Sequence, residues 1–109
     1  MAGSYVLSSN DKGQYSFVLK SESGSTLLRS EVYNAKASAE NGIASVQRNS
    51  PDEARYERKT ASDGREYFNL KATNGQVIGT SSMYPSVEAR DAAIEATKVD
   101  GPSGTVTAG

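Results

Sequence analysis

Two lysines, Lys20 and Lys71, hold matching places in the chain, since each follows a Phe-x-Leu step. Side chains alternate across a β-strand, so both lysines are predicted to point away from the Phe and Leu of their own stretch, and Tyr67 to lie on the same side as Lys71. A cationic, partly aromatic sheet face can hold the phosphates and stack the bases of single-stranded nucleic acid. Lys20, Lys71 and Tyr67 are therefore candidate ligand-binding residues. The alternative is a solvated outer face, which is favoured by the balanced charge nearby and by Ser16 at the position that matches Tyr67.

The chain contains no histidine and no cysteine. Imidazole triads, thiol nucleophiles and the usual transition-metal ligands are thereby excluded. Ser30 and Ser81 are possible nucleophiles, but no imidazole or evidently activated lysine is present to accept the proton, so a turn or capping role is expected. We expect no enzymatic activity, no cofactor and no metal site.

Two further sets of residues recur at matching positions. Tyr33 and Tyr84 each come just before a predicted helix, and we interpret them as anchors of the connection between strand and helix. The four recurring glycines lie between strands, whereas the glycines of phosphate-binding loops lead from a strand into a helix. They therefore predict hairpin turns, at Gly13, Gly24, Gly64 and Gly75.

These recurrences share one spacing. Phe17, Leu19 and Lys20 return 51 positions later as Phe68, Leu70 and Lys71, with no gap over about 45 residues. A constant offset over that length predicts a duplicated supersecondary unit. Each half, at about 50 residues, is too small to bury an adequate core of its own, so the two repeats are expected to share one.

Hydrophobic periodicity predicts the elements of each repeat. Alternation of apolar residues predicts three strands, and a period near 3.6 then predicts a helix. In the first repeat the strands are 4–8, 15–20 and 26–30, and the helix is 35–49 with Asn34 as its N-cap; the second helix is 85–98, entered through Ser86. Gly42, inside the first helix, is expected to allow close approach of helix and sheet. The fold class is α+β: two tandem β-β-β-α repeats forming one antiparallel sheet, with both helices on one face and approximate twofold symmetry.

Length and composition set the domain organisation. Residues 1–100 are predicted to form a single domain of two repeats, 4–50 and 55–100, and residues 101–109 a disordered tail, because they show no period and little bulk. Twelve basic against thirteen acidic residues give a net charge of −1, which makes duplex nucleic acid an improbable partner. No apolar run is long enough to span a membrane and no export signal is visible, so we expect a cytoplasmic monomer with no membrane association and partners not identified by the sequence.

The repeat pattern resembles the YegP-like family of small, uncharacterised bacterial proteins. The likeness rests on Phe-x-Leu-Lys, a following Gly, Ser-x-x-Tyr and the helical stretch from Ala39 to Val46, and it covers nearly everything from Ser4 to Lys98. The resemblance implies tandem units of three strands and a helix in one antiparallel sheet, with C-terminal segments exchanged between units. It implies no reaction, cofactor or partner.

The favoured function is a non-catalytic binding or interaction module of unknown ligand. The alternative, from another class, is a weak binder of single-stranded nucleic acid or nucleotides that uses the open sheet face. A small enzyme comes third because histidine and cysteine are absent.

Overall fold

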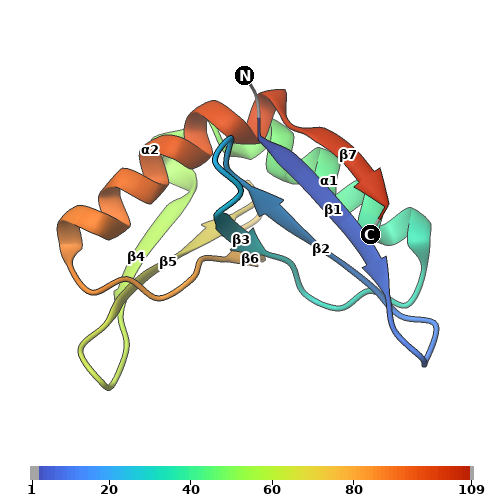
Figure 1. Cartoon of the computed structure of the whole chain (residues 1–109), viewed down its shortest axis with the longest axis horizontal. Coiled ribbons are helices and arrows are strands. Elements are labelled where there is room, and N and C mark those ends of the chain that lie inside the picture. The colour runs from blue at the N-terminus through green and yellow to red at the C-terminus, as the bar shows by residue number, and fades with distance from the viewer. Residues whose placement is uncertain (1–2, 109) are drawn as a thin grey trace.

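The computed structural model describes residues 3–108, without the side chains of Ser103 and Ala108. It contains one sheet of seven strands, two α-helices and one 3₁₀ turn. Figure 1 shows the β1–β2 and β4–β5 hairpins extending to opposite sides, with β3 and β6 between them. In chain order the elements are β1 (Ser4–Ser9), β2 (Tyr15–Lys20), β3 (Thr26–Arg29), α1 (Lys36–Asn49), η1 (Glu53–Arg55), β4 (Tyr56–Thr60), β5 (Glu66–Lys71), β6 (Val77–Thr80), α2 (Val87–Ser103) and β7 (Thr105–Ala108).

The strands lie in the order β4-β5-β6-β3-β2-β1-β7. Neighbouring strands are antiparallel except β1 and β7, which are parallel, so the sheet is mixed. The prediction of a wholly antiparallel sheet is therefore wrong at this edge. It failed because β7 lies in a segment for which the sequence pattern predicted no strand.

The predicted disordered tail is also wrong for residues 101–108. Helix α2 continues past Lys98 to Ser103, and β7 then pairs along the whole of Ser4 to Leu7 in β1. The hydroxyl of Tyr5 donates a hydrogen bond to the carbonyl of Gly101 at 2.7 Å. A β-carbon on Gly104 would lie 2.7 Å from the Tyr5 ring, so the glycine allows this close packing. Gly109, and Met1 and Ala2 of the predicted domain, lie outside the described residues.

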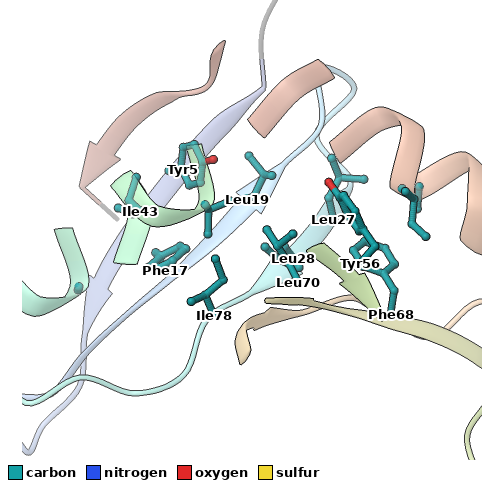
Figure 2. Close-up of a cluster of buried hydrophobic side chains, with 14 of the residues drawn as sticks. Tyr5, Phe17, Leu19, Leu27, Leu28, Ile43, Tyr56, Phe68, Leu70 and Ile78 are labelled. Carbon is teal, nitrogen blue, oxygen red and sulfur yellow. The ribbon is translucent and has the colours of Figure 1, made fainter. Parts of the chain in front are cut away.

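Both repeats contribute to one hydrophobic core, as their size requires. Tyr5 packs edge-on against Phe17 with ring centroids 6.0 Å apart, and Tyr56 meets Phe68 at 5.5 Å. Figure 2 shows Leu28 and Leu70 between these two aromatic pairs. The two helices add apolar side chains to the same cluster, namely Ala39, Ile43, Val46, Ala93 and Ile94.

The starts of the two helices differ from each other. Ser86 caps α2 as predicted, because its Oγ accepts a hydrogen bond from the amide of Ala89 at 3.1 Å. Asn34 does not cap α1: the N-cap is Ala35, which makes no side-chain hydrogen bond. The Asn34 side chain instead accepts a hydrogen bond from Gln14 in the β1–β2 turn, at 3.4 Å. A side chain therefore caps the start of α2, whereas the residue before the start of α1 contacts the β1–β2 turn instead.

The expected role of Gly42 is confirmed by its surroundings in α1. A β-carbon there would lie 3.0 Å from the Phe17 ring and 2.6 Å from the hydroxyl oxygen of Tyr33. The rings of Phe17 and Tyr33 are stacked at 6.3 Å. Glycine at this position lets α1 lie directly over that stack.

Residues 51 positions apart touch each other where the repeats meet. Arg29 of β3 pairs with Thr80 of β6, its own counterpart. Leu28 fits against Gly79, where a β-carbon would lie 2.7 Å from the leucine side chain. In the same way Gly101 leaves room for Ser50, which is fully buried. At two of these three contacts a glycine faces the larger counterpart residue, so the two repeats carry different side chains there.

Candidate functional site

The sheet has two faces that differ in character. The core face carries the buried strand residues of the hydrophobic core, such as Phe17 and Leu70. The outer face is defined here as the side chains that alternate with them along the strands. A row of seven residues, one from each strand, runs across the outer face, and each residue pairs through its main chain with the next. In order they are Thr107, Val6, Val18, Arg29, Thr80, Asn69 and Glu57.

The outer face concentrates positive charge. Seven charged residues lie within the strands, and Arg58 and Glu66 belong to the core face by alternation. The other five are on the outer face: Lys20, Arg29, Lys59, Lys71 and Glu57. Four cations and one carboxylate give this face a charge of +3. Because the net charge of the chain is −1, the rest of the chain carries −4.

In the second repeat, polar side chains of the outer face bind one another. Lys71 Nζ lies 3.1 Å from one carboxylate oxygen of Glu57, and Asn69 donates to the other oxygen at 3.0 Å. Thr80 then donates to Asn69 at 2.8 Å. The hydrogen bond from Asn69, followed by that from Lys71, lowers the pKa of Glu57. The charge of Lys71 is therefore largely balanced by its neighbour.

In the first repeat, the outer-face cations lack such a partner. Among residues 3–108, neither Lys20 nor Arg29 has a carboxylate within ion-pair distance. The position that matches Glu57 is Val6, and the position that matches Asn69 is Val18. These two cations consequently stand beside apolar side chains rather than beside a carboxylate.

The structure places all three predicted candidates on the outer face, but it does not bring them together. Lys20 on β2 and Lys71 on β5 are separated by β3 and β6. Tyr67 pairs across the β4–β5 hairpin with Lys59 and is partly exposed. Sequence reasoning missed Arg29, the cation nearest the middle of this face. A shift of register between Leu19 and Lys20 decides which β3 residue faces outward, and no local pattern revealed it.

The other recurring residues have structural roles. Ser30 Oγ accepts from the Phe17 amide at 2.9 Å and donates to the Glu31 carbonyl, and Ser81 makes the same two bonds one repeat later. Both serines therefore join the end of one strand to its neighbour, which is a structural role but not the turn or capping role expected. Tyr33 and Tyr84 pair their main chains with Tyr15 and Glu66 and so hold the connections to the helices, as predicted. All four recurring glycines have positive φ in hairpin turns.

A second group of charged residues lies between α2 and the β4–β5 hairpin. Arg90 Nη1 is 2.9 Å from Glu66, and its Nε is 3.1 Å from Asp91. Asp91 also pairs with Arg58, which reaches Glu53 at 2.6 Å. We call Glu53, Arg58, Glu66, Arg90, Asp91 and Lys98 the ionic cluster. Its charges neutralise one another, so it joins helix to strand rather than presenting a reactive group.

Residues 3–108 show neither an enclosed pocket nor a group of three or more acidic side chains placed to hold a metal ion. Within the same part of the chain, neither helix is long and apolar enough to cross a membrane.

This duplicated α+β arrangement defines a family. The sequence profile of a domain of unknown function, DUF1508, matches residues 10–57 and again residues 61–107, and the chain belongs to that family. It is similar to the UPF0339 protein YegP of Escherichia coli O6:H1, with 56% identity over 106 residues that cover 97% of this chain and 96% of the relative. A UPF0339 protein of Acinetobacter baylyi is 58% identical over the same length, again covering 97% of this chain and 96% of the relative.

Two solution NMR structures share the fold. YegP from Escherichia coli, described as a protein of unknown function, superposes with a TM-score of 0.92 at 53% identity, covering 99% of this chain and 93% of that one. A UPF0339 protein from Shewanella oneidensis gives the same TM-score at 48% identity, covering 99% and 92%. The resemblance to the YegP-like family is therefore confirmed, and the two matches of the profile support the tandem repeat.

Proposed function

We propose that this chain is a non-catalytic interaction module whose outer face binds an anionic partner. The observation that carries the proposal is the separation of charge: +3 on the outer face against −4 elsewhere. A face of one sign attracts ligands of the opposite sign and orients their approach. Because the face is open, the partner is expected to be extended rather than a small molecule enclosed in a pocket.

The proposal includes a layout in which both helices cover the core face and leave the outer face bare. Its support is that α1 and α2 both contribute buried side chains to the one cluster formed by the core face. It also takes the two repeats, 4–50 and 55–100, to be related by an approximate twofold axis. The contacts between counterpart residues, Arg29 with Thr80 and Leu28 with Gly79, are what such an axis requires.

The proposed module acts as a cytoplasmic monomer. The two repeats of one chain bury the hydrophobic core together, so a second chain is not needed to complete it. Sedimentation at several protein concentrations tests this part, and a concentration-dependent dimer would contradict it.

Heparin, a general polyanion, tests the outer face. Titrated at low ionic strength into the ¹⁵N-labelled protein, it should shift the amide resonances of Val18, Arg29 and Thr80 and leave those of buried α1 residues in place. Added salt should reverse the shifts, because exposed charges are screened. Shifts confined to the helices, or no shift at low salt, would contradict the proposal.

A further inference from the structure

The two halves of the outer face are not equivalent as anion sites, although they come from one repeat. In the second half, Glu57 holds Lys71 at 3.1 Å and Asn69 at 3.0 Å. In the first half, the matching residues are Val6, Lys20 and Val18. The first half thus has the lysine but carries Val6 in place of the carboxylate that neutralises Lys71 in the second half.

Arg29 adds a second cation to the first half. It pairs by main chain with Val18, and Lys20 is two residues further along the same strand. In a regular antiparallel ladder such diagonal neighbours lie roughly 7–8 Å apart, and here a shift of register falls between Leu19 and Lys20. The counterpart of Arg29 is the uncharged Thr80, so among residues 3–108 the first repeat has two outer-face cations outside any ion pair, whereas the second has one, Lys59. Glu22 and Glu31, which follow the two cations in the chain, lie outside the strands.

From this asymmetry we infer that the first half of the outer face binds the phosphate backbone of single-stranded nucleic acid through Lys20 and Arg29. The inference rests on the proposed function and names its partner. Arginine and lysine on a sheet face suit successive phosphates of a flexible strand, and Val6 and Val18 offer apolar surface to the sugars and bases between them. Tyr67, beside Lys59 at the other end of the face, can stack a base of a strand that crosses the sheet.

The charge of the whole chain agrees with a weak, salt-sensitive complex. Contact with two or three phosphates gives a slope of log K against log salt of about −1.4 to −2 for a single strand. The net charge of −1 and the acidic remainder of the surface oppose tighter binding and disfavour duplex nucleic acid. Binding is therefore expected at low ionic strength and should weaken steeply as salt is added.

Replacing charged residues with glutamine tests how much each half of the outer face contributes to binding. Lys20→Gln with Arg29→Gln removes both cations of the first half, and should weaken binding of a fluorescent oligonucleotide of about 12 residues by about tenfold in an anisotropy titration. Lys71→Gln with Glu57→Gln is the matched control, since it removes the ion pair of the second half without changing the net charge of the outer face, and should leave the affinity within about twofold. Equal losses in the two variants would overturn the inference.

Glu57→Val provides a gain of binding. It gives the second repeat the residue that the first repeat carries at Val6, so the fold tolerates the side chain at this position. Freeing Lys71 should tighten oligonucleotide binding by about threefold or more and steepen the salt slope by about 0.7. A folded Glu57→Val variant, checked by its urea midpoint, with unchanged affinity would contradict the assignment.

Two other polyanions distinguish this inference from the proposed function. A poly-glutamate peptide and inorganic polyphosphate of similar charge are titrated in parallel with the oligonucleotide. If they bind through Lys20 and Arg29 and the oligonucleotide does not, the outer face remains an anion-binding surface and the nucleic-acid inference fails. If none of the three binds, both fail. Preference for the oligonucleotide, lost on Tyr67→Ala as well as on Lys20→Gln with Arg29→Gln, supports the inference.

Discussion

The two repeats solve the same packing problem with opposite chemistry. Where α2 lies against the β4–β5 hairpin, the chain uses Arg58, Glu66 and Arg90 of the ionic cluster. The matching residues of the first repeat are Leu7, Tyr15 and Ala39, which belong to the hydrophobic core or pack against it.

The difference shows that the same backbone arrangement can be packed either with ion pairs or with apolar side chains. Buried ion pairs are seldom more stable than apolar packing of similar volume, but removing one partner is costly. The ionic residues of the second repeat therefore have to be changed as a set, and so do the apolar residues of the first. The four predictions below test how far the repeats differ and how far they remain equivalent.

The largest effect is expected where counterpart residues touch. Leu28→Gly empties a fully buried site and should lower the free energy of unfolding by about 3–5 kcal/mol. Gly79→Leu should cost about 2–3 kcal/mol by overpacking against Leu28. The double variant exchanges the two side chains. If the two positions are equivalent, its loss of unfolding free energy is smaller than the sum of the losses in the two single variants. Urea unfolding of all three variants measures this coupling, and simple additivity would contradict the twofold relation.

A smaller loss is expected within the ionic cluster. Arg90→Ala leaves Glu66, whose side chain is 14% exposed, without its cation and should cost about 2–3 kcal/mol. Arg90→Ala with Glu66→Tyr installs the pair that the first repeat carries and should recover part of that loss. Arg55→Ala is the control, because its ion pair with Asp52 is more exposed and should contribute less than about 1 kcal/mol. A double variant less stable than Arg90→Ala would show that the two repeats are not exchangeable here.

The next prediction concerns a feature that both repeats share. Tyr5 donates to the carbonyl of Gly101, and Tyr56 donates to the carbonyl of Ser50, each at 2.7 Å. Burial raises the pKa of both phenols, so both remain donors at ordinary pH. Tyr5→Phe and Tyr56→Phe should each cost about 1 kcal/mol in urea unfolding. Tyr67→Phe serves as a control, and markedly unequal losses at the first two positions would break the equivalence.

The smallest effect is a dependence on pH that belongs to the second repeat. Hydrogen bonds from Arg58 and then Lys98 lower the pKa of Glu53 to about 2 from its ordinary value of 4.5. A lowered pKa means that the unfolded chain binds the proton first, so this stabilisation is complete above pH 4.5 and is lost as the pH falls toward 2. Because Glu53 is exposed, the contribution should be below about 1 kcal/mol. Glu53→Gln should be less stable than the parent at neutral pH, and the gap should close in acid; a constant gap would contradict this origin.

Local patterns predicted much of the fold. Alternating apolar residues and turn glycines located the β1–β2 and β5–β6 hairpins, and Ser86 located the start of α2. Local patterns could not predict that residues 101–108 form regular secondary structure. Their position depends on distant contacts, such as the hydrogen bond between Tyr5 and Gly101, which are 96 positions apart. The candidate surface was found in part: Lys20, Lys71 and Tyr67 follow from alternation. Pairing between strands brings Glu57 to Lys71 and leaves Arg29 without an ion pair among the described residues, and a local pattern does not reveal either.

The parallel contact between β1 and β7 has a consequence for how the protein is made. Tyr5 is translated 96 residues before its acceptor Gly101, and β1 is likewise translated well before β7, the strand that pairs beside it. Because contacts between distant parts of a chain form slowly, the β1 edge should stay incomplete until β7 has been translated and has paired with it. We therefore expect the nascent chain to acquire its full resistance to proteolysis only once β7 has left the ribosome, rather than one repeat at a time.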